Sequence, residues 1–267
     1  MNIRLALLAR APLVTRLGET RLLSIVCVVL TIALIVAMLI TASLSNLPDL
    51  KAISDTNQRK AVFFDFLMPI VEDQNNAILA QRERLLDIEK EYRSNQRLSF
   101  MAKLRLKALA RDYAVEWDDK ASVAMIDELK RRVDLVPVPL VLVQAAKESG
   151  WGTSRFALEG NNLFGQWCYT PGCGIVPSKR SAGASHEVQV FDSVDDAIAA
   201  YLHNINTGRA YKSLRQIRAG QRRAGKRPEG QKLADGLLYY SERRQAYVDE
   251  VKQMLQQYHR FEAQRQG

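Results

Sequence analysis

The sequence predicts a mainly α-helical protein that carries a small β-hairpin lobe and begins with a transmembrane helix. Three observations support this fold class. An uncharged apolar run lies near the N-terminus, apolar residues recur at helical spacing between residues 57 and 261, and residues 186–191 alternate polar and apolar side chains in the manner of a strand. With 267 residues, of which 47% are hydrophobic, the chain can form one sizeable core with accessory segments.

The apolar run predicts a membrane anchor. Residues 22–44 contain no charged residue, and the stretch from Leu22 to Ile40 is long enough to cross the ~30 Å hydrocarbon core of a bilayer. The basic residues that precede it are Arg4, Arg10, Arg16 and Arg21. Because basic residues stay on the cytoplasmic side, we expect residues 1–21 to lie in the cytoplasm. The single span would hold the protein at the inner membrane, and the residues after it would lie in the periplasm.

A cleaved signal peptide is the alternative to an anchor. The small residues Thr41-Ala42-Ser43 could serve a signal peptidase. The apolar region is, however, longer than the ~7–15 residues usual in signal peptides, so an uncleaved anchor is favoured.

Helical periodicity organises the chain after the anchor. Residues 57–113 read as helical, but Pro69 should kink or divide the first helix, and Ser94-Asn95-Gln96 marks a break after a helix at about 76–92. This region is either a stalk or the first layer of the following domain. Further helices are expected at 99–113 and 122–132, after Pro137 and Pro139 where the helix that bears Glu148 starts, after the capping residue Ser193, from residue 211, and at 241–261.

Two of the three cysteines are placed to form a disulfide. Cys168 and Cys173 bracket a Pro-Gly turn that can bring their Cβ atoms together, and an oxidising compartment would join them. Zinc binding with His186 and His203 is the alternative, but the spacing fits no usual zinc pattern. Cys27 lies in the apolar run as a small apolar residue. We therefore expect a disulfide, and neither a metal nor a cofactor.

Basic residues are concentrated in one segment. The chain has a net charge of +9, and Glu229 is the only acid between Arg209 and Lys232. The basic residues inside this segment are Lys212, Arg215, Arg218, Arg222, Arg223, Lys226 and Arg227. Such a face suits an anionic polymer or a membrane surface, although a solvated face without a partner is the alternative. An exported domain does not meet nucleic acid, so we expect no nucleic-acid partner.

Glu148 is the candidate for acid–base chemistry. It shares one helical stripe with Val141, Gln144 and Ala145, at the end of an apolar helix that a Gly-Trp-Gly segment terminates. Partial burial against Trp151 would raise the pKa of the carboxyl, which a general acid at neutral pH needs. The alternative is a helix-terminal glutamate in water.

An ordered series of motifs extends this interpretation. The chain contains Ala145-Ala146-Lys147-Glu148-Ser149-Gly150-Trp151-Gly152-Thr153-Ser154 and then Gly160-Asn161-Asn162-Leu163-Phe164-Gly165. Further motifs lie at 167–168, 171–174, 186–188 and 200–207. Over residues 134–218 the chain resembles the glucosaminidase domain of glycoside hydrolase family 73, and within that family the Bax-type bacterial proteins.

The resemblance implies a lysozyme-like fold and hydrolysis of the β-1,4 bond after N-acetylglucosamine in the glycan strands of peptidoglycan. It makes Glu148 the general acid. It also assigns Tyr211 to the cleft, where a tyrosine helps to place the N-acetyl group or the reacting water; ordinary packing is the alternative for this residue. The expected organisation is a cytoplasmic segment at 1–21, a transmembrane helix at 22–44, a helical stalk or layer at 45–115, and the glucosaminidase domain at 116–267.

The second carboxylate is less well defined. Family members often place an acid on the β-lobe, where this chain offers Glu187, within the predicted strand. Glu187 is either the general base of an inverting enzyme or points into solvent, in which case the acetamido group of the substrate would act as nucleophile. The substrate-binding candidates are Trp151, Phe164 and Trp167, whose rings could stack on sugars or lie in the core, together with Asn161 and Asn162.

Two other functions are alternatives to this interpretation. A lytic transglycosylase uses a single helix-borne glutamate on a similar fold, but its later motifs have no clear counterpart in this sequence. A noncatalytic, membrane-anchored wall-binding protein would tolerate replacement of Glu148. Nothing in the residues favours the peptide or mannosyl-glycoprotein substrates to which the family label is sometimes extended.

Overall fold

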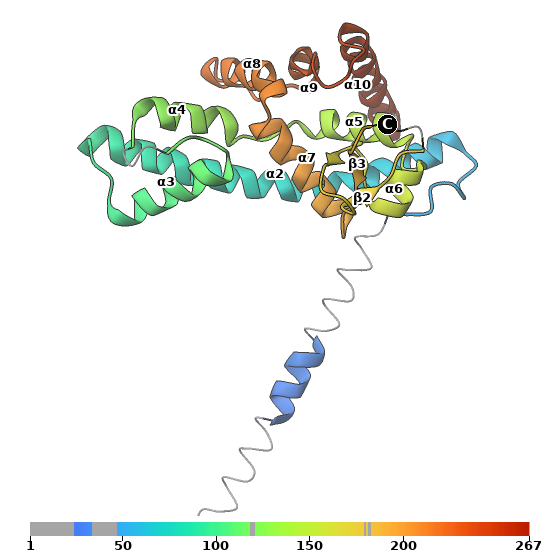
Figure 1. Ribbon diagram of the computed structural model, residues 1–267, viewed down its shortest axis with the longest axis horizontal. Coiled ribbons are helices and arrows are strands. Elements are labelled where there is room, and N and C mark those ends of the chain that lie inside the picture. The colour runs from blue at the N-terminus through green and yellow to red at the C-terminus, as the bar shows by residue number, and fades with distance from the viewer. Residues whose placement is uncertain (1–23, 34–46, 118–120, 179, 181–182, 267) are drawn as a thin grey trace, which may run out of the picture. The chain divides into compact units, whose positions relative to one another are not determined.

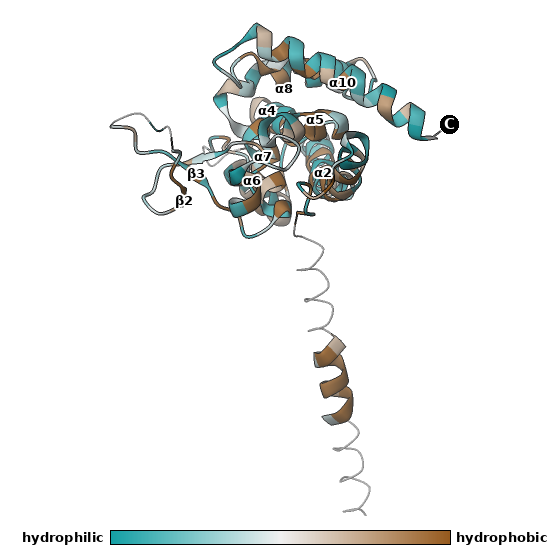
Figure 2. Ribbon diagram, turned by 90° about the vertical axis from the view of Figure 1, so that its right-hand side faces the viewer, coloured by the Kyte–Doolittle hydropathy of each residue, from teal (hydrophilic) through white to brown (hydrophobic). Residues whose placement is uncertain are grey.

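The computed structural model describes residues 24–33, 47–117, 121–178, 180 and 183–266 (Figure 1). The chain divides into two units, residues 1–46 and residues 47–267. In the first unit residues 24–33 form a helix of exposed and mostly apolar side chains, largely brown in Figure 2. Among the residues described, no helix is both long and apolar enough to cross a membrane. The expected cytoplasmic segment and both ends of the expected span lie outside the described residues.

A single long helix, α2, runs through the second unit from Thr56 to Asn95. Asp55 caps its N-terminus by accepting a hydrogen bond from the backbone N–H of Gln58 at 2.7 Å. The sequence predicts a kink or break at Pro69 and a separate helix at 76–92, and the break is wrong, because α2 continues through Pro69. Buried residues in the turns on both sides of the proline, such as Leu67 and Val71, hold the helix against the core and offset the missing N–H donor.

The remaining helices follow the predicted order, and serine residues cap several of them. Ser99, Ser122, Ser154 and Ser193 each accept a hydrogen bond from the third residue after them. The helices are α3 Phe100–Asp112, α4 Val123–Arg132, α5 Val138–Ser149, α6 Arg155–Gly160, α7 Val194–Thr207, α8 Lys212–Arg223, α9 Gly230–Leu233 and α10 Gln245–Gln266, with 3-10 turns η1 Arg209–Tyr211 and η2 Ala234–Leu237.

Two hydrophobic cores share α2. The first half of α2 packs with α5, α7 and α10 in the main core, to which it contributes Phe63, Phe64, Leu67 and Val71. The second half packs with α3 and α4 in a smaller core (Figure 1). The segment that the sequence left open as stalk or layer is therefore part of the folded unit, and α2 forms a layer beneath α5.

A three-stranded antiparallel sheet forms the β-lobe. Strands β1 Trp167–Cys168 and β2 Gly174–Ile175 lie on either side of β3 Glu187–Gln189. The predicted strand is therefore present, although shorter than expected. Gly174 is required by this pairing, because a Cβ atom there would lie 2.1 Å from the carbonyl oxygen of Val188.

The predicted basic face on α8 is only partly exposed. Arg218 is fully buried, and its guanidinium donates to backbone oxygens that include those of Asp134 and Leu135 at 3.0 and 2.9 Å. Arg222 binds the Asp134 carboxylate at 2.7 and 3.1 Å, and Arg215 is buried as well. Arg218 and Arg222 hold α8 against the segment before α5, whereas Arg215 donates to the carbonyls of Ile205 and Gly208, because backbone carbonyls that leave water need donors. The exposed basic residues of the segment are Arg209, Lys212, Arg223, Lys226, Arg227 and Lys232.

Candidate active site

Glu148 lies in the last turn of α5, as the sequence predicts. The helix ends at Ser149, and Gly150, Trp151 and Gly152 follow with positive φ angles of 59°, 60° and 72°. The Ser149 hydroxyl fixes this turn, since it donates to the Ala145 carbonyl at 2.6 Å and accepts from the Gly152 N–H at 2.7 Å. Glycine adopts such angles without a steric cost, which explains why glycines flank the tryptophan.

The Glu148 carboxyl is partly buried and incompletely paired. Its Oε1 atom is buried and has no hydrogen-bond partner among the described residues. Burial raises the pKa of Glu148 above its ordinary value, while a hydrogen bond from Tyr247 and the charge of Lys147 act in the opposite direction. A raised pKa keeps the carboxyl protonated to higher pH, which suits a proton donor.

A chain of buried hydrogen bonds leads to this carboxyl. The Tyr201 hydroxyl donates to Oε1 of Gln144 at 2.6 Å, and Nε2 of Gln144 donates to the Tyr247 hydroxyl at 2.9 Å. The Tyr247 hydroxyl already accepts from Gln144, so its own proton is directed to Glu148. Three helices, α5, α7 and α10, thus fix the position of the candidate acid.

Four tyrosines surround the carboxyl. Burial raises the pKa of Tyr201, Tyr211, Tyr240 and Tyr247, and the nearby charge of Glu148 adds to the effect on each of them. Their rings also contact one another, with centroids 5.1 Å apart for Tyr240 and Tyr247 and 6.0 Å apart for Tyr211 and Tyr240. The site therefore consists of one carboxyl among neutral hydroxyl groups, with the predicted Tyr211 among them.

Trp151 is turned toward α2. Its ring contacts Phe63 and Phe64 edge-on, with centroids 5.7 and 5.3 Å apart, and the ammonium group of Lys60 lies 5.3 Å from the ring centroid. The sequence predicts that Trp151 buries Glu148. In the structure the aromatic contacts of this ring lie on α2, and the four tyrosines are the aromatic residues whose pKa values respond to Glu148, so burial of the acid by Trp151 stays a prediction.

The turn after α6 is stabilised by its asparagines. Both amide hydrogens of Asn162 are donated, to the carbonyls of Gln166 at 2.9 Å and Gln189 at 2.8 Å, and its Oδ1 accepts from two backbone N–H groups. Asn161 caps α6 and donates to the Phe191 carbonyl at 3.0 Å. These two predicted substrate-binding residues join the turn to the β-lobe.

The two remaining aromatic candidates have different environments. Phe164 is buried and stacks on Tyr201, with centroids 4.0 Å apart. Trp167, on β1, is 55% exposed and stacks on His186 at 4.1 Å. Of the three predicted sugar-stacking rings, Trp167 is thus the most exposed to solvent.

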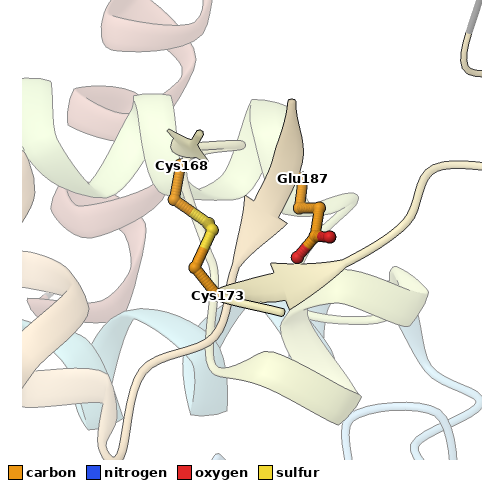
Figure 3. Close-up of side chains that lie close together, drawn as sticks. All are labelled: Cys168, Cys173 and Glu187. Carbon is orange, nitrogen blue, oxygen red and sulfur yellow. A yellow bond between two sulfur atoms is a disulfide. The ribbon is translucent and has the colours of Figure 1, made fainter. Parts of the chain in front are cut away.

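Glu187 is bound to the disulfide loop (Figure 3). One carboxylate oxygen accepts from the Gly172 N–H at 3.1 Å and the other from the Gly174 N–H at 2.8 Å, and these bonds lower its pKa. The side chain is 8% exposed, so the solvent-pointing alternative is wrong. Cys168 and Cys173 are joined in a disulfide, as predicted, with Cα atoms 6.2 Å apart. Both sulfurs are therefore bonded to each other and not available as thiolate ligands for zinc.

The sequence interpretation missed Tyr247 and Tyr240. Both lie outside the motif series, and Tyr247 is separated from Gln144 by 103 positions. The available signal was the apolar stripe of the last helix, in which Tyr247, Val251, Leu255 and Tyr258 recur at helical spacing and are buried.

The chain is similar to known proteins over most of its length. A glucosaminidase family model, described as mannosyl-glycoprotein endo-beta-N-acetylglucosaminidase, matches residues 123–260. The chain therefore belongs to the glucosaminidase family, a family of glycoside hydrolases. Protein bax of Escherichia coli (strain K12) is 35% identical over 216 residues, which make up 81% of this chain and 76% of that protein. No solved structure matches the chain significantly.

Proposed function

We propose that this protein is a peptidoglycan hydrolase, an endo-β-N-acetylglucosaminidase that hydrolyses the β-1,4 bond after N-acetylglucosamine. The observation that carries the proposal is the Glu148 carboxyl. It is delivered by a buried helix in a chain of the glucosaminidase family, its pKa is raised by burial, and one oxygen has no partner within the part of the chain that the structure describes. Such a carboxyl has a proton to give and one oxygen whose hydrogen-bonding capacity is unused.

In this mechanism Glu148 donates its proton to the glycosidic oxygen while the bond from that oxygen to C1 of N-acetylglucosamine breaks. Tyr247 then stabilises the carboxylate that forms, because a hydroxyl donor favours the ionised acid. Tyr211 is the candidate for orienting the N-acetyl group or the water, since the charge of Glu148 reaches it. Trp167 is the candidate platform for a neighbouring sugar ring.

The positive charge that develops at C1 also needs a partner. We favour the acetamido oxygen of the substrate, which would attack C1 to form a cyclic intermediate that water then opens at C1. The supporting observation is that both oxygens of Glu187 already accept backbone N–H groups. Glu187 as a general base is the second candidate, and its lowered pKa, which keeps it ionised, favours that role over an acid.

We also propose that residues 22–44 anchor the protein in the inner membrane with the catalytic unit in the periplasm, next to its substrate. The support is the uncharged run, the arginines before it and the disulfide, which persists in oxidising compartments. A periplasmically active reporter fused after Asn46 should be functional. Recovery of a soluble form that starts near Ser43 would replace the anchor with a cleaved signal.

Digestion of purified peptidoglycan tests the reaction type. After borohydride reduction, mass analysis should find fragments that end in reduced N-acetylglucosamine. Fragments with an anhydro-muramic end would identify a lytic transglycosylase, and fragments with reduced muramic ends a muramidase. Absence of any cleavage by folded protein would favour a noncatalytic wall-binding protein.

A further inference from the structure

Helix α3 leaves large apolar side chains on the surface, far from the site of Glu148. Phe100, Met101 and Leu104 are 76%, 55% and 48% exposed. Burial of Ala102, Leu106 and Ala110 against the smaller core defines the inner side of the helix. The outer face of α3 therefore comprises Phe100, Met101, Leu104 and Ala108, followed by the basic residues Lys107 and Arg111. Clusters of exposed apolar residues of this kind usually mark an interaction surface.

The charge of α3 identifies the kind of partner. From Arg93 to Arg111 the sequence contains six basic residues and no acid. These residues are Arg93, Arg97, Lys103, Arg105, Lys107 and Arg111. Arg93 is paired with Glu89 and Arg111 with Asp112, whereas the other four make no ion pair within 4 Å with any residue in the described part of the chain. Apolar side chains surrounded by uncompensated basic ones are typical of helices that lie in the interface of an anionic bilayer.

We propose that the outer face of α3 binds the surface of a bilayer that contains anionic phospholipids. Phe100, Met101 and Leu104 would enter the boundary between headgroups and acyl chains, and Arg97, Lys103, Arg105 and Lys107 would contact the lipid phosphates. The proposal adds a second membrane contact, made by the folded unit itself. It depends neither on the hydrolytic activity nor on whether residues 22–44 span a membrane.

This contact would orient the hydrolase. Figure 1 shows α3 along one edge of the folded unit and α8, α9 and α10 along the opposite edge. With α3 on the lipid, α10 faces away from the membrane, and the unit is fixed at a constant height above the bilayer. A partly apolar, basic contact is reversible and sensitive to salt, because screening weakens its electrostatic part.

Depth-dependent quenching in proteoliposomes tests this contact on the full chain. A Cys27→Ser background leaves the disulfide intact and permits one fluorescent label, either at Ala108→Cys on α3 or at Gln256→Cys, an exposed control site on α10. Both labelled proteins carry the same N-terminal segment, so any difference reports on the folded unit. Lipids with a nitroxide in the upper acyl chain serve as the quencher in vesicles of phosphatidylcholine with phosphatidylglycerol.

We expect quenching at position 108 to exceed that at position 256 by about twofold or more, and to fall with added salt. The double variant Phe100→Ser with Leu104→Ser should remove the difference in quenching between the two positions. The double variant Lys103→Glu with Lys107→Glu should do the same. Both pairs lie on the surface, so the circular dichroism spectrum should be unchanged. Equal quenching at the two positions, or quenching that the serine pair leaves intact, would overturn the proposal. Self-quenching of the label at 108 in detergent without lipid would also overturn it, since a second copy of the chain would then cover this face.

Discussion

The amide nitrogen of Gln144 donates a hydrogen bond to the Tyr247 hydroxyl at 2.9 Å, one helical turn before Glu148. This bond joins α5 to α10 and leaves the Tyr247 proton for the Glu148 carboxyl. The acid is thus controlled by two opposed effects, since burial raises its pKa and the tyrosine lowers it.

Tyr247→Phe removes the hydroxyl and keeps the ring that stacks on Tyr240. In the parent protein the hydrogen bond from Tyr247 lowers the pKa of Glu148. The variant lacks this bond, so the pKa of Glu148 should rise. Because the acid is active when protonated, the decline of kcat at high pH should move to higher pH, even though the less well positioned carboxyl lowers the maximal rate. Tyr258→Phe on the same helix is the control. An unchanged pH profile would show that Tyr247 has only a packing role.

Glu148→Gln should stabilise the folded protein at neutral pH. Burial disfavours the ionised form, so the folded pKa exceeds the unfolded one, and the carboxyl costs stability as pH rises through this interval. Below pH ~4, where the acid is protonated in both states, this cost disappears. Urea unfolding at several pH values should show the variant gaining stability over the parent as pH rises. A constant difference across that range would contradict the raised pKa.

Arg218→Met should strongly destabilise the protein. The guanidinium supplies hydrogen bonds to four backbone carbonyls and to Asn206, which would lose their donors in the dry interior. Removing one partner of a buried charged network costs about 3–5 kcal/mol, measured as the free energy of unfolding in urea. Arg223→Met, at an exposed position in the same helix, should change it by less than ~0.5 kcal/mol. Similar effects of the two substitutions would contradict the inward orientation of Arg218.

Glu187→Gln tests whether the second carboxylate reacts or supports the loop. One glutamine oxygen cannot replace two carboxylate oxygens at the Gly172 and Gly174 N–H groups, so the disulfide loop should loosen. We expect KM to rise with kcat changed less than ~10-fold, and the joint substitution of Cys168 and Cys173 by serine should act in the same direction. A fall in kcat of ~10²–10⁴-fold at unchanged KM would instead identify Glu187 as the general base. The closed loop is short, so the cysteine variant should lose less than the ~3 kcal/mol typical of a 15-residue loop.

Features encoded locally were predictable from the sequence. The cap at Ser122, the prolines before α5 and the glycines after it set helix boundaries within a residue or two, and the Pro-Gly turn between Cys168 and Cys173 brought the sulfurs together. The same local signals at the end of α5 made it possible to predict that Glu148 lies in the last turn of this helix.

Features that depend on distant contacts were not predictable. Pro69 does not break α2, because core packing on both sides outweighs the local penalty. Arg218 looks like a surface charge in the sequence, and its four backbone acceptors lie more than 80 positions earlier in the chain. Tyr247 reaches Gln144 only through the packing of α10 on α5. Such pairings follow from tertiary structure and leave no local pattern.

The most direct test of the central claim compares the parent with Glu148→Gln in the digestion of purified peptidoglycan. Glutamine preserves the shape of the side chain but cannot donate the proton to the leaving oxygen, so hydrolysis should fall by ~10²-fold or more while circular dichroism stays unchanged. Release of reduced N-acetylglucosamine ends by the variant within a few-fold of the parent would contradict the assignment of Glu148 as the general acid.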